Sequence, residues 1–228
     1  MNYIWCEDTG SGHAFWQFLF PNCKVEGKNG ISRLRRAVAC INKNEDQFYV
    51  IVDTALDNPD VLREIQRLSS IVATKSNVTL LMIHSFEFVL LSFKLLEDWV
   101  FAEDDELKNK RRPLLNVRNE LVKSISNGLN QYAVSEYSDV GVYLKENGYN
   151  TEQAAAKLLF SLTRNTGFET DKSKIGPCWI VDCCTWEDKK DDDICGLSDN
   201  KIDSRVKATT IFENSVLSKM AGWKELFV

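Results

Sequence analysis

The 228-residue chain has only 4 prolines, 11 glycines and 2 histidines, and it has no long apolar run. Such low proline and glycine contents exclude a collagen-like or low-complexity protein. Each apolar run is broken within about ten residues, whereas a helix needs roughly 20 to cross a bilayer. We therefore expect a globular protein with no membrane partner.

A basic excess is also missing, because 28 Lys and Arg stand against 33 Asp and Glu, for a net charge of −5. This balance excludes a protein that coats nucleic acid through bulk positive charge, but not an enzyme that binds phosphates locally. The N-terminal segment has no basic stretch and reaches an acid at Glu7, so no signal peptide is expected. The odd number of cysteines, seven, then favours reduced thiols in a cytoplasmic protein.

What the first 85 or so residues do contain is an alternation of short apolar segments with segments of helical spacing. This alternation predicts an α/β fold, in which helices cover both faces of a parallel sheet. The expected strands are 2–6, 23–26, 48–52 and 78–83, and the expected helices are 13–20, 31–41 and 61–72, the last with Asp60 as its N-cap.

The rest of the chain is predicted to be rich in helix. The expected helices are 86–101, 114–129, 151–162 with Thr151 as N-cap, and 204–220, and one further strand is expected at 178–184. A charge-dense stretch between them is typical of a linker or an exposed helix end. The predicted organisation is an α/β domain over 1–102, this linker over 103–113 and a mostly helical region over 114–228.

Acidic residues follow the predicted strands. Glu7 and Asp53 come directly after two of them and Glu87 lies just beyond a third, while Asp8 and Asp57 are close by. The carboxyl ends of parallel strands carry functional groups, and neighbouring strands are only about 4.8 Å apart. Converging carboxylates need a cation, and Mg²⁺ prefers such oxygen ligands. The alternative is that each acid only caps a helix or forms a turn.

The order strand, Glu7, helix, strand, helix, strand, Asp53 resembles the Toprim domain of topoisomerases, primases and small nucleases. Residues 27–30 (GKNG) and Glu87 are similar to a Toprim-like subgroup that includes effector nucleases of bacterial anti-phage systems. The resemblance implies a hydrolase that cleaves nucleic acid with Mg²⁺ or Mn²⁺. It assigns catalysis to Glu7 and Asp53, and metal binding to Glu7, Asp53, Asp57, Asp8 and Glu87.

The chain also departs from that family. Asp8 stands where the family usually has Gly after its Glu, and Ala55 stands where it has a second Asp. Glu26 is followed by Gly as in the family, but it leaves too little chain before Asp53 for the intervening elements. The departures leave two interpretations open: a shifted metal site built from Glu7, Asp53 and Asp57, or a module that has lost catalysis.

Local positive charge offers a nucleic-acid contact at Lys28, Arg33 and Arg36, of which the two arginines are spaced to share a helix face. A solvated helix face is the alternative. His84, at the end of a predicted strand, is a further candidate for the site, against a packed or surface role.

Four cysteines crowd the C-terminal region and raise the alternative of a zinc site: Cys178, Cys183, Cys184 and Cys195. In a straight strand, however, Cys178 and Cys184 lie about 20 Å apart, too far for one ion. Zinc would need a bend in the chain, and buried reduced thiols are the competing interpretation.

Two functions are therefore expected to compete. The first is a Mg²⁺-dependent nuclease of Toprim type acting on RNA or DNA; by resemblance it is an antiviral defence effector beside an ATPase subunit, with a homo-oligomer as a further expectation. The second is a catalytically inactive Toprim-like module that serves as a protein-interaction subunit.

Overall fold

The computed structural model describes residues 1–42, 45–54, 58–101, 109, 112–126, 150–163, 203–220, 222, 223 and 226. Several predictions fall outside these residues: those on Ala55 and Asp57, most of the 103–113 stretch, the 178–184 strand and the four cysteines considered for zinc.

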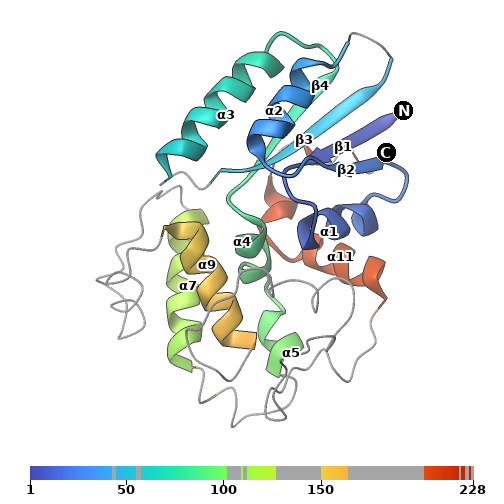
Figure 1. Ribbon diagram of the computed structural model, residues 1–228. Coiled ribbons are helices and arrows are strands. Elements are labelled where there is room, and N and C mark those ends of the chain that lie inside the picture. Colours follow the sequence, from blue (N-terminus) through green and yellow to red (C-terminus); the bar gives the residue numbers. More distant parts are fainter. Residues whose placement is uncertain are drawn as a thin grey trace.

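Four parallel strands form the sheet, in the order β2-β1-β3-β4 (Figure 1). They are β1 (Asn2–Cys6), β2 (Lys24–Gly27), β3 (Gln47–Asp53) and β4 (Val78–Ile83). The core of β3 is buried on both faces, as its run of aromatic and β-branched residues requires. The predicted α/β fold with a parallel sheet is therefore confirmed.

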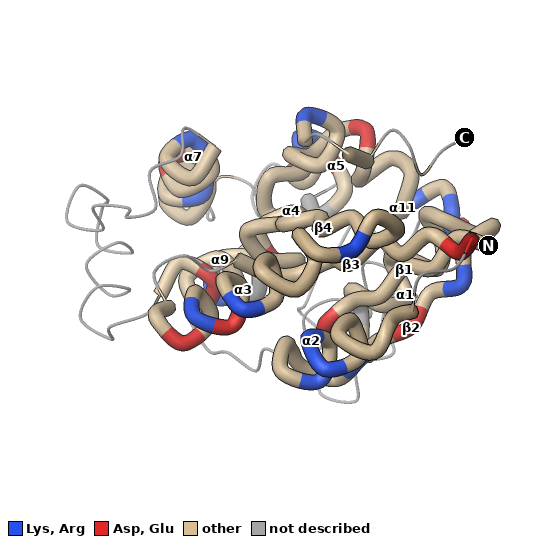
Figure 2. The backbone as a smooth tube through the Cα atoms, turned by 90° about the horizontal axis from the view of Figure 1, so that it is seen from above, with Lys and Arg blue, Asp and Glu red and all other residues tan. Residues whose placement is uncertain are grey.

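Three helices connect these strands and cover both faces of the sheet. On one face, α2 (Ile31–Ala39) and α3 (Pro59–Val72) pack through Leu34, Val38 and Leu68. On the other, α1 (Ser11–Leu19) packs through Phe15 and Trp16. Figure 2 shows basic positions along α2 and mixed charges along α3. The strand order reverses between β1 and β3, and α1 and α2 accordingly lie on opposite faces of the sheet. α/β sheets form a ligand crevice at such a reversal.

The predicted cap of α3 is wrong. The side chain of Asn58, not Asp60, accepts hydrogen bonds from the backbone N–H groups of Asp60 and Val61. Pro59 explains the shift, since proline favours the first position of a helix and so leaves the cap to the residue before it.

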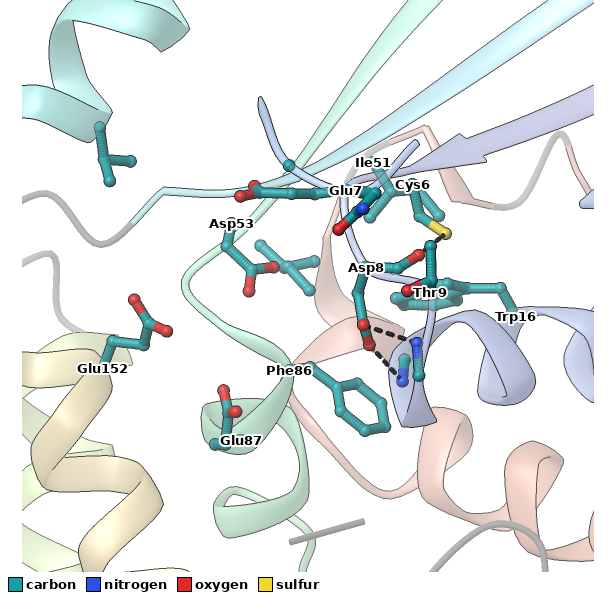
Figure 3. A pocket seen from close by; sticks show the side chains of 16 residues that line it. Cys6, Glu7, Asp8, Thr9, Trp16, Ile51, Asp53, Phe86, Glu87 and Glu152 are labelled. Atoms are coloured by element: carbon teal, nitrogen blue, oxygen red, sulfur yellow. Dashed lines mark hydrogen bonds between the residues drawn. The ribbon is translucent and has the colours of Figure 1, made fainter. Parts of the chain in front are cut away.

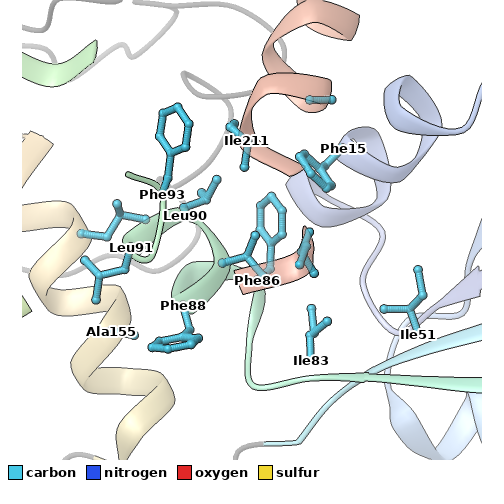
Figure 4. Close-up of a cluster of buried hydrophobic side chains, with 14 of the residues drawn as sticks. Phe15, Ile51, Ile83, Phe86, Phe88, Leu90, Leu91, Phe93, Ala155 and Ile211 are labelled. Carbon is cyan, nitrogen blue, oxygen red and sulfur yellow. The ribbon is translucent and has the colours of Figure 1, made fainter. Parts of the chain in front are cut away.

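The rest of the described chain adds further helices: α4 (Phe86–Leu91), α5 (Leu96–Phe101), α7 (Arg112–Ser126), α9 (Thr151–Thr163), α11 (Ser204–Glu213) and the 3₁₀ helix η4 (Val216–Lys219). Among them, α11 packs against α1, and α7 and α9 pack against α4. One buried cluster joins sheet residues such as Ile51 and Ile83 to Phe86, Ala155 and Ile211 (Figure 4). One buried cluster therefore contains residues from both the predicted α/β domain and the predicted helical region.

The expected single helix over 86–101 is wrong, because α4 ends at Leu91 and α5 begins at Leu96. Buried Arg118 of α7 donates Nε to the carbonyl of Leu91 and Nη2 to that of Phe93, each at 2.7 Å. The Lys94 N–H meanwhile donates to the carbonyl of Asn214. Tertiary hydrogen bonds replace the helical ones at this break. The expected helix over 204–220 is likewise divided, into α11 and η4.

Thr151 is also not the cap of α9. Asn150 and Gln153 form a reciprocal capping box, in which each side chain accepts from the other's backbone N–H, at 2.8 Å and 3.1 Å. The Thr151 hydroxyl is thereby released for another contact, described below. None of the helices in the described part of the chain is long and apolar enough to cross a membrane.

Candidate functional site

A cavity of about 600 Å³ opens at the carboxyl ends of the strands. It lies at the β1/β3 position where the strand order reverses. Five acidic residues line it, from four different parts of the fold: Glu7, Asp8, Asp53, Glu87 and Glu152 (Figure 3). No described lining residue is Lys, Arg or His. The cavity therefore combines a large formal negative charge with no basic side chain in the described part of its wall.

Glu7 and Asp53 reach the cavity from adjacent strands. Cys6 pairs with Ile51 in the β1–β3 register, so Glu7 follows the end of β1 one step behind Asp53, the last residue of β3. Both carboxylates extend to the same side of this edge in Figure 3. Both residues therefore line the same cavity.

Glu87 and Glu152 approach from the opposite wall, on helices. Glu87 lies in the first turn of α4, 9% exposed, where Ser85 caps the helix by accepting from the Phe88 N–H. Glu152 lies in the first turn of α9. Figure 3 shows both side chains directed toward Asp53. Glu87 was predicted from its place after a strand, whereas Glu152 was missed.

Asp8 has a second role besides lining the cavity. Its carboxylate accepts hydrogen bonds from the backbone N–H groups of Gly10, at 2.7 Å, and Gly12, at 2.9 Å (Figure 3). These are N–H groups at the start of α1, which a carboxylate stabilises. Asp8 thus matches the helix-terminus interpretation of an acid that follows a strand.

The pKa of the Cys6 thiol reflects burial and the charges at this edge of the sheet. Burial raises its pKa to about 12, and the negative charges of Asp8 and Asp53 add to the rise, while Lys28 opposes it. Its Sγ donates to the Asp8 carbonyl at 3.3 Å. Cys6 is therefore a protonated, buried thiol at neutral pH and not a nucleophile.

The 27–30 turn holds the loop that carries Glu7 and Asp8. The Lys28 N–H donates to the Cys6 carbonyl and the Gly30 N–H to the Glu7 carbonyl, at 2.8 Å and 2.9 Å. Gly30 has φ 107°, a conformation that side chains other than glycine's rarely allow. The GKNG segment therefore supports the cavity wall through its backbone.

The predicted basic cluster does not line the cavity. Lys28 is paired with Glu26 at 2.6 Å, and its Nζ lies 3.8 Å from the centre of the Trp5 ring. Trp5 packs on the α2/α3 face of the sheet, so these contacts hold the Lys28 charge on that side. Arg33 and Arg36 are exposed on α2. Glu26 also pairs with Lys24, and these partners hold the pKa of the Glu26 carboxyl below its usual value.

His84 directly follows β4 and sits beside the cavity wall. Its Nε2 lies 2.9 Å from the Thr151 hydroxyl, and its ring contacts Phe88. It does not line the cavity itself. It contacts, instead, the residue that precedes Glu152.

The donor chemistry suits a hard divalent cation, since the lining acids supply only oxygen ligands. Within the described residues, however, no three Asp, Glu, His or Cys side chains form a group that could hold a metal ion. The acids therefore share a cavity without meeting around one point.

Comparison of the chain with protein-family models, with curated proteins and with solved structures gives no match.

Proposed function

We propose that this chain is a Mg²⁺-dependent nuclease of the Toprim type, which cleaves phosphodiester bonds in RNA or DNA. One observation carries the proposal: the carboxylates of Glu7 and Asp53 leave adjacent parallel strands at the β1/β3 reversal and line one cavity with Glu87 and Glu152. A cation bound there would offset the repulsion between these carboxylates.

A hydrated ion does not require the acids to meet around one point. Mg²⁺ commonly retains several of its water molecules in protein sites, so carboxylates that do not meet around one point can still bind it. Glu7 and Asp53 are the residues that would hold it, with Glu87 on the facing wall. When bound, the ion polarises the phosphodiester and stabilises the attacking or leaving oxygen.

The protein's own contribution is to hold the backbone that carries these carboxylates. Glu7 is fixed by the hydrogen bond between its carbonyl and the Gly30 N–H, and Asp53 by its place at the end of a buried strand. Exposed Arg33 and Arg36 on α2 offer contacts to the nucleic-acid backbone outside the cavity.

The test is cleavage of single- and double-stranded RNA and DNA by the purified chain, with and without Mg²⁺ or Mn²⁺. Asp53→Asn keeps the shape of the side chain and removes its charge. We expect a loss of at least about 100-fold, since a bound metal contributes several kcal/mol to the transition state. Asp98→Asn, at an exposed position of α5, is the matched control. Cleavage without metal, or full activity of Asp53→Asn, contradicts the proposal.

A second candidate is an inactive Toprim-like module that serves as a protein-interaction subunit. It is favoured by the lack of a ready metal-binding group among the described residues. Absence of cleavage on every substrate, together with no Mn²⁺ binding by calorimetry, would support this second function.

A further inference from the structure

The strands at the two edges of the sheet differ in how they are protected. β2, at one edge, is short and carries Lys24 and Glu26, which form an ion pair. The carbonyl of Val25, on the outer side of β2, lies 3.4 Å from Nε2 of His13 on α1. Charged residues and a covering side chain are common means by which proteins keep an edge strand from pairing with another chain.

β4, at the other edge, is an uncharged strand. Its sequence, VTLLMI, contains no charged residue, no proline and no glycine. The carbonyls of Asn77 and Ile83 accept hydrogen bonds from the β3 side. Because backbone groups alternate in direction along a strand, those of Val78, Leu80 and Met82 point outward, and among the described residues the sheet has no strand beyond them.

The side chains at these outward positions lie on the face of the sheet that α2 and α3 cover. Val78 and Leu80 pack in the cluster on that face, whereas Met82, the next in the alternation, is 47% exposed. Of the large apolar side chains exposed in the described part of the chain, Met82 alone belongs to a strand. On the opposite face β4 is covered, since Leu81 and Ile83 are buried in the main cluster.

The helix that packs against β4 is also uncharged on the side turned away from α2. The carboxylate of Glu64 on α3 accepts hydrogen bonds from Ser32 and Arg35 of α2, so it marks the side that faces α2. By helical spacing, the opposite side of α3 and its C-cap carries Leu62, Gln66, Ser69 and Ala73. Because α3 packs against β4, an uncharged surface continues from the edge strand to this helix.

We propose that the β4 edge is a self-association surface, where a second copy of this chain pairs antiparallel to β4 and extends the sheet across two chains. With the twofold axis at Leu80, this residue pairs with its own copy, and Val78 pairs with the partner's Met82. The outward backbone groups then form about six hydrogen bonds. The exposed Met82 side chain is covered by the partner's Val78 on the α2/α3 face.

A second copy is the occupant that the edge fits, because a twofold pairing brings each strand against its own sequence. Like charges opposite each other destabilise a strand pair, so self-pairing requires an uncharged strand, as β4 is. The chain has a net charge of −5, which makes two copies repel each other. An uncharged strand beside an uncharged helix side is a surface at which they can approach. This inference does not depend on the proposed nuclease activity.

Sedimentation equilibrium of the full chain over a concentration series, combined with amide hydrogen exchange, tests the proposal. We expect a dimer, and slow exchange of the Leu80 and Met82 amides that becomes fast on dilution. Met82→Lys introduces a charge of the kind that protects edge strands, at a side chain that is already half exposed, and should raise the dimer dissociation constant about tenfold or more. Val206→Lys, on α11 and 53% exposed, is the matched control and should have no effect.

The outcomes separate the possible occupants of the edge. A wild-type chain that stays monomeric overturns the proposal: slow β4 amides would then mean that another part of the same chain covers the edge, and fast ones that it is open to a different partner. A dimer that Met82→Lys leaves intact, or whose outward β4 amides exchange equally fast at every concentration, uses another surface and also overturns it. Dissociation of Met82→Lys with an unchanged Tm, beside an intact Val206→Lys dimer, supports it.

Discussion

Replacing Gly27 with alanine should destabilise the protein and disturb its candidate site together. Gly27 ends β2, and a Cβ built there would lie 2.9 Å from Thr9 Cγ2 and 3.0 Å from Thr9 Cα, and closer still to the carbonyl oxygen of Asp8. Backbone atoms cannot rotate away as the end of a flexible side chain can. The loop that carries Glu7 and Asp8 must therefore move.

The size of the effect follows from this overlap. Extra methyl groups in tightly packed places cost about 1–3 kcal/mol, and here the strained atoms belong to the backbone, so we expect about 3 kcal/mol. Gly30→Ala is the contrasting variant in the same turn. Its Cβ would meet nothing within 4 Å, but its φ of 107° is unfavourable for alanine, at a cost of about 1–2 kcal/mol.

Urea unfolding followed by circular dichroism measures both costs, and Mn²⁺ calorimetry measures the site. Gly27→Ala should lower the unfolding midpoint more than Gly30→Ala does, and it should also weaken metal binding, because the displaced loop carries Glu7. A Gly27→Ala protein as stable as wild type would refute the close approach of β2 to this loop. Lost stability with unchanged metal binding would refute the link between the turn and the site.

Two further predictions concern buried groups. Arg118→Met should lower the free energy of unfolding in urea by about 3 kcal/mol, because two charge-assisted hydrogen bonds to the carbonyls at the end of α4 are lost. Arg118→Lys should not restore these bonds, since lysine lacks the planar guanidinium group. Equal stability of Arg118→Met and wild type would contradict this. Cys6 has its pKa raised in the folded state, from 9.0 to about 12, so its contribution to stability is complete below pH 9 and falls as the pH rises toward 12. The gap in unfolding free energy between wild type and Cys6→Ala should therefore narrow between pH 8 and pH 10, by up to about 1.4 kcal/mol for each pH unit above 9, and a constant gap would contradict this.

Local sequence patterns located the sheet well, above all its central strand β3, which is a buried apolar run. The apolar runs of β1 and β4 end at the predicted residues, Cys6 and Ile83, and the turn residues between elements mark the connections. The break between α4 and α5 was missed, since residues 86–101 contain no proline or glycine. Hydrogen bonds from Arg118 and to Asn214 make that break. Both partners lie far along the chain, so the local sequence pattern does not reveal them.

The same distinction between local and tertiary signals applies to the residues of the candidate site. Glu7, Asp53 and Glu87 could be predicted, because a residue that follows a parallel strand is placed at the sheet edge by its own element. Glu152 could not, since its position depends on how α9 packs against α4. The capping box at Asn150 and Gln153 would have fixed the start of α9, and so the exposure of Glu152, but not what it faces.

The acids of the cavity differ in whether contacts within the folded chain stabilise their charge. Asp8 accepts two N–H groups at the start of α1, and such hydrogen bonds stabilise the folded chain with no ligand present. Glu152 gains from the dipole of α9 for the same reason. Glu7 directly follows β1 and Asp53 ends β3, and a strand has no helix dipole to stabilise such a charge. If a cation is what they bind, their neutral replacements Glu7→Gln and Asp53→Asn should weaken its binding. The two variants would then lose stabilisation by added Mn²⁺, whereas removal of the Asp8 charge would destabilise the protein whether or not metal is added.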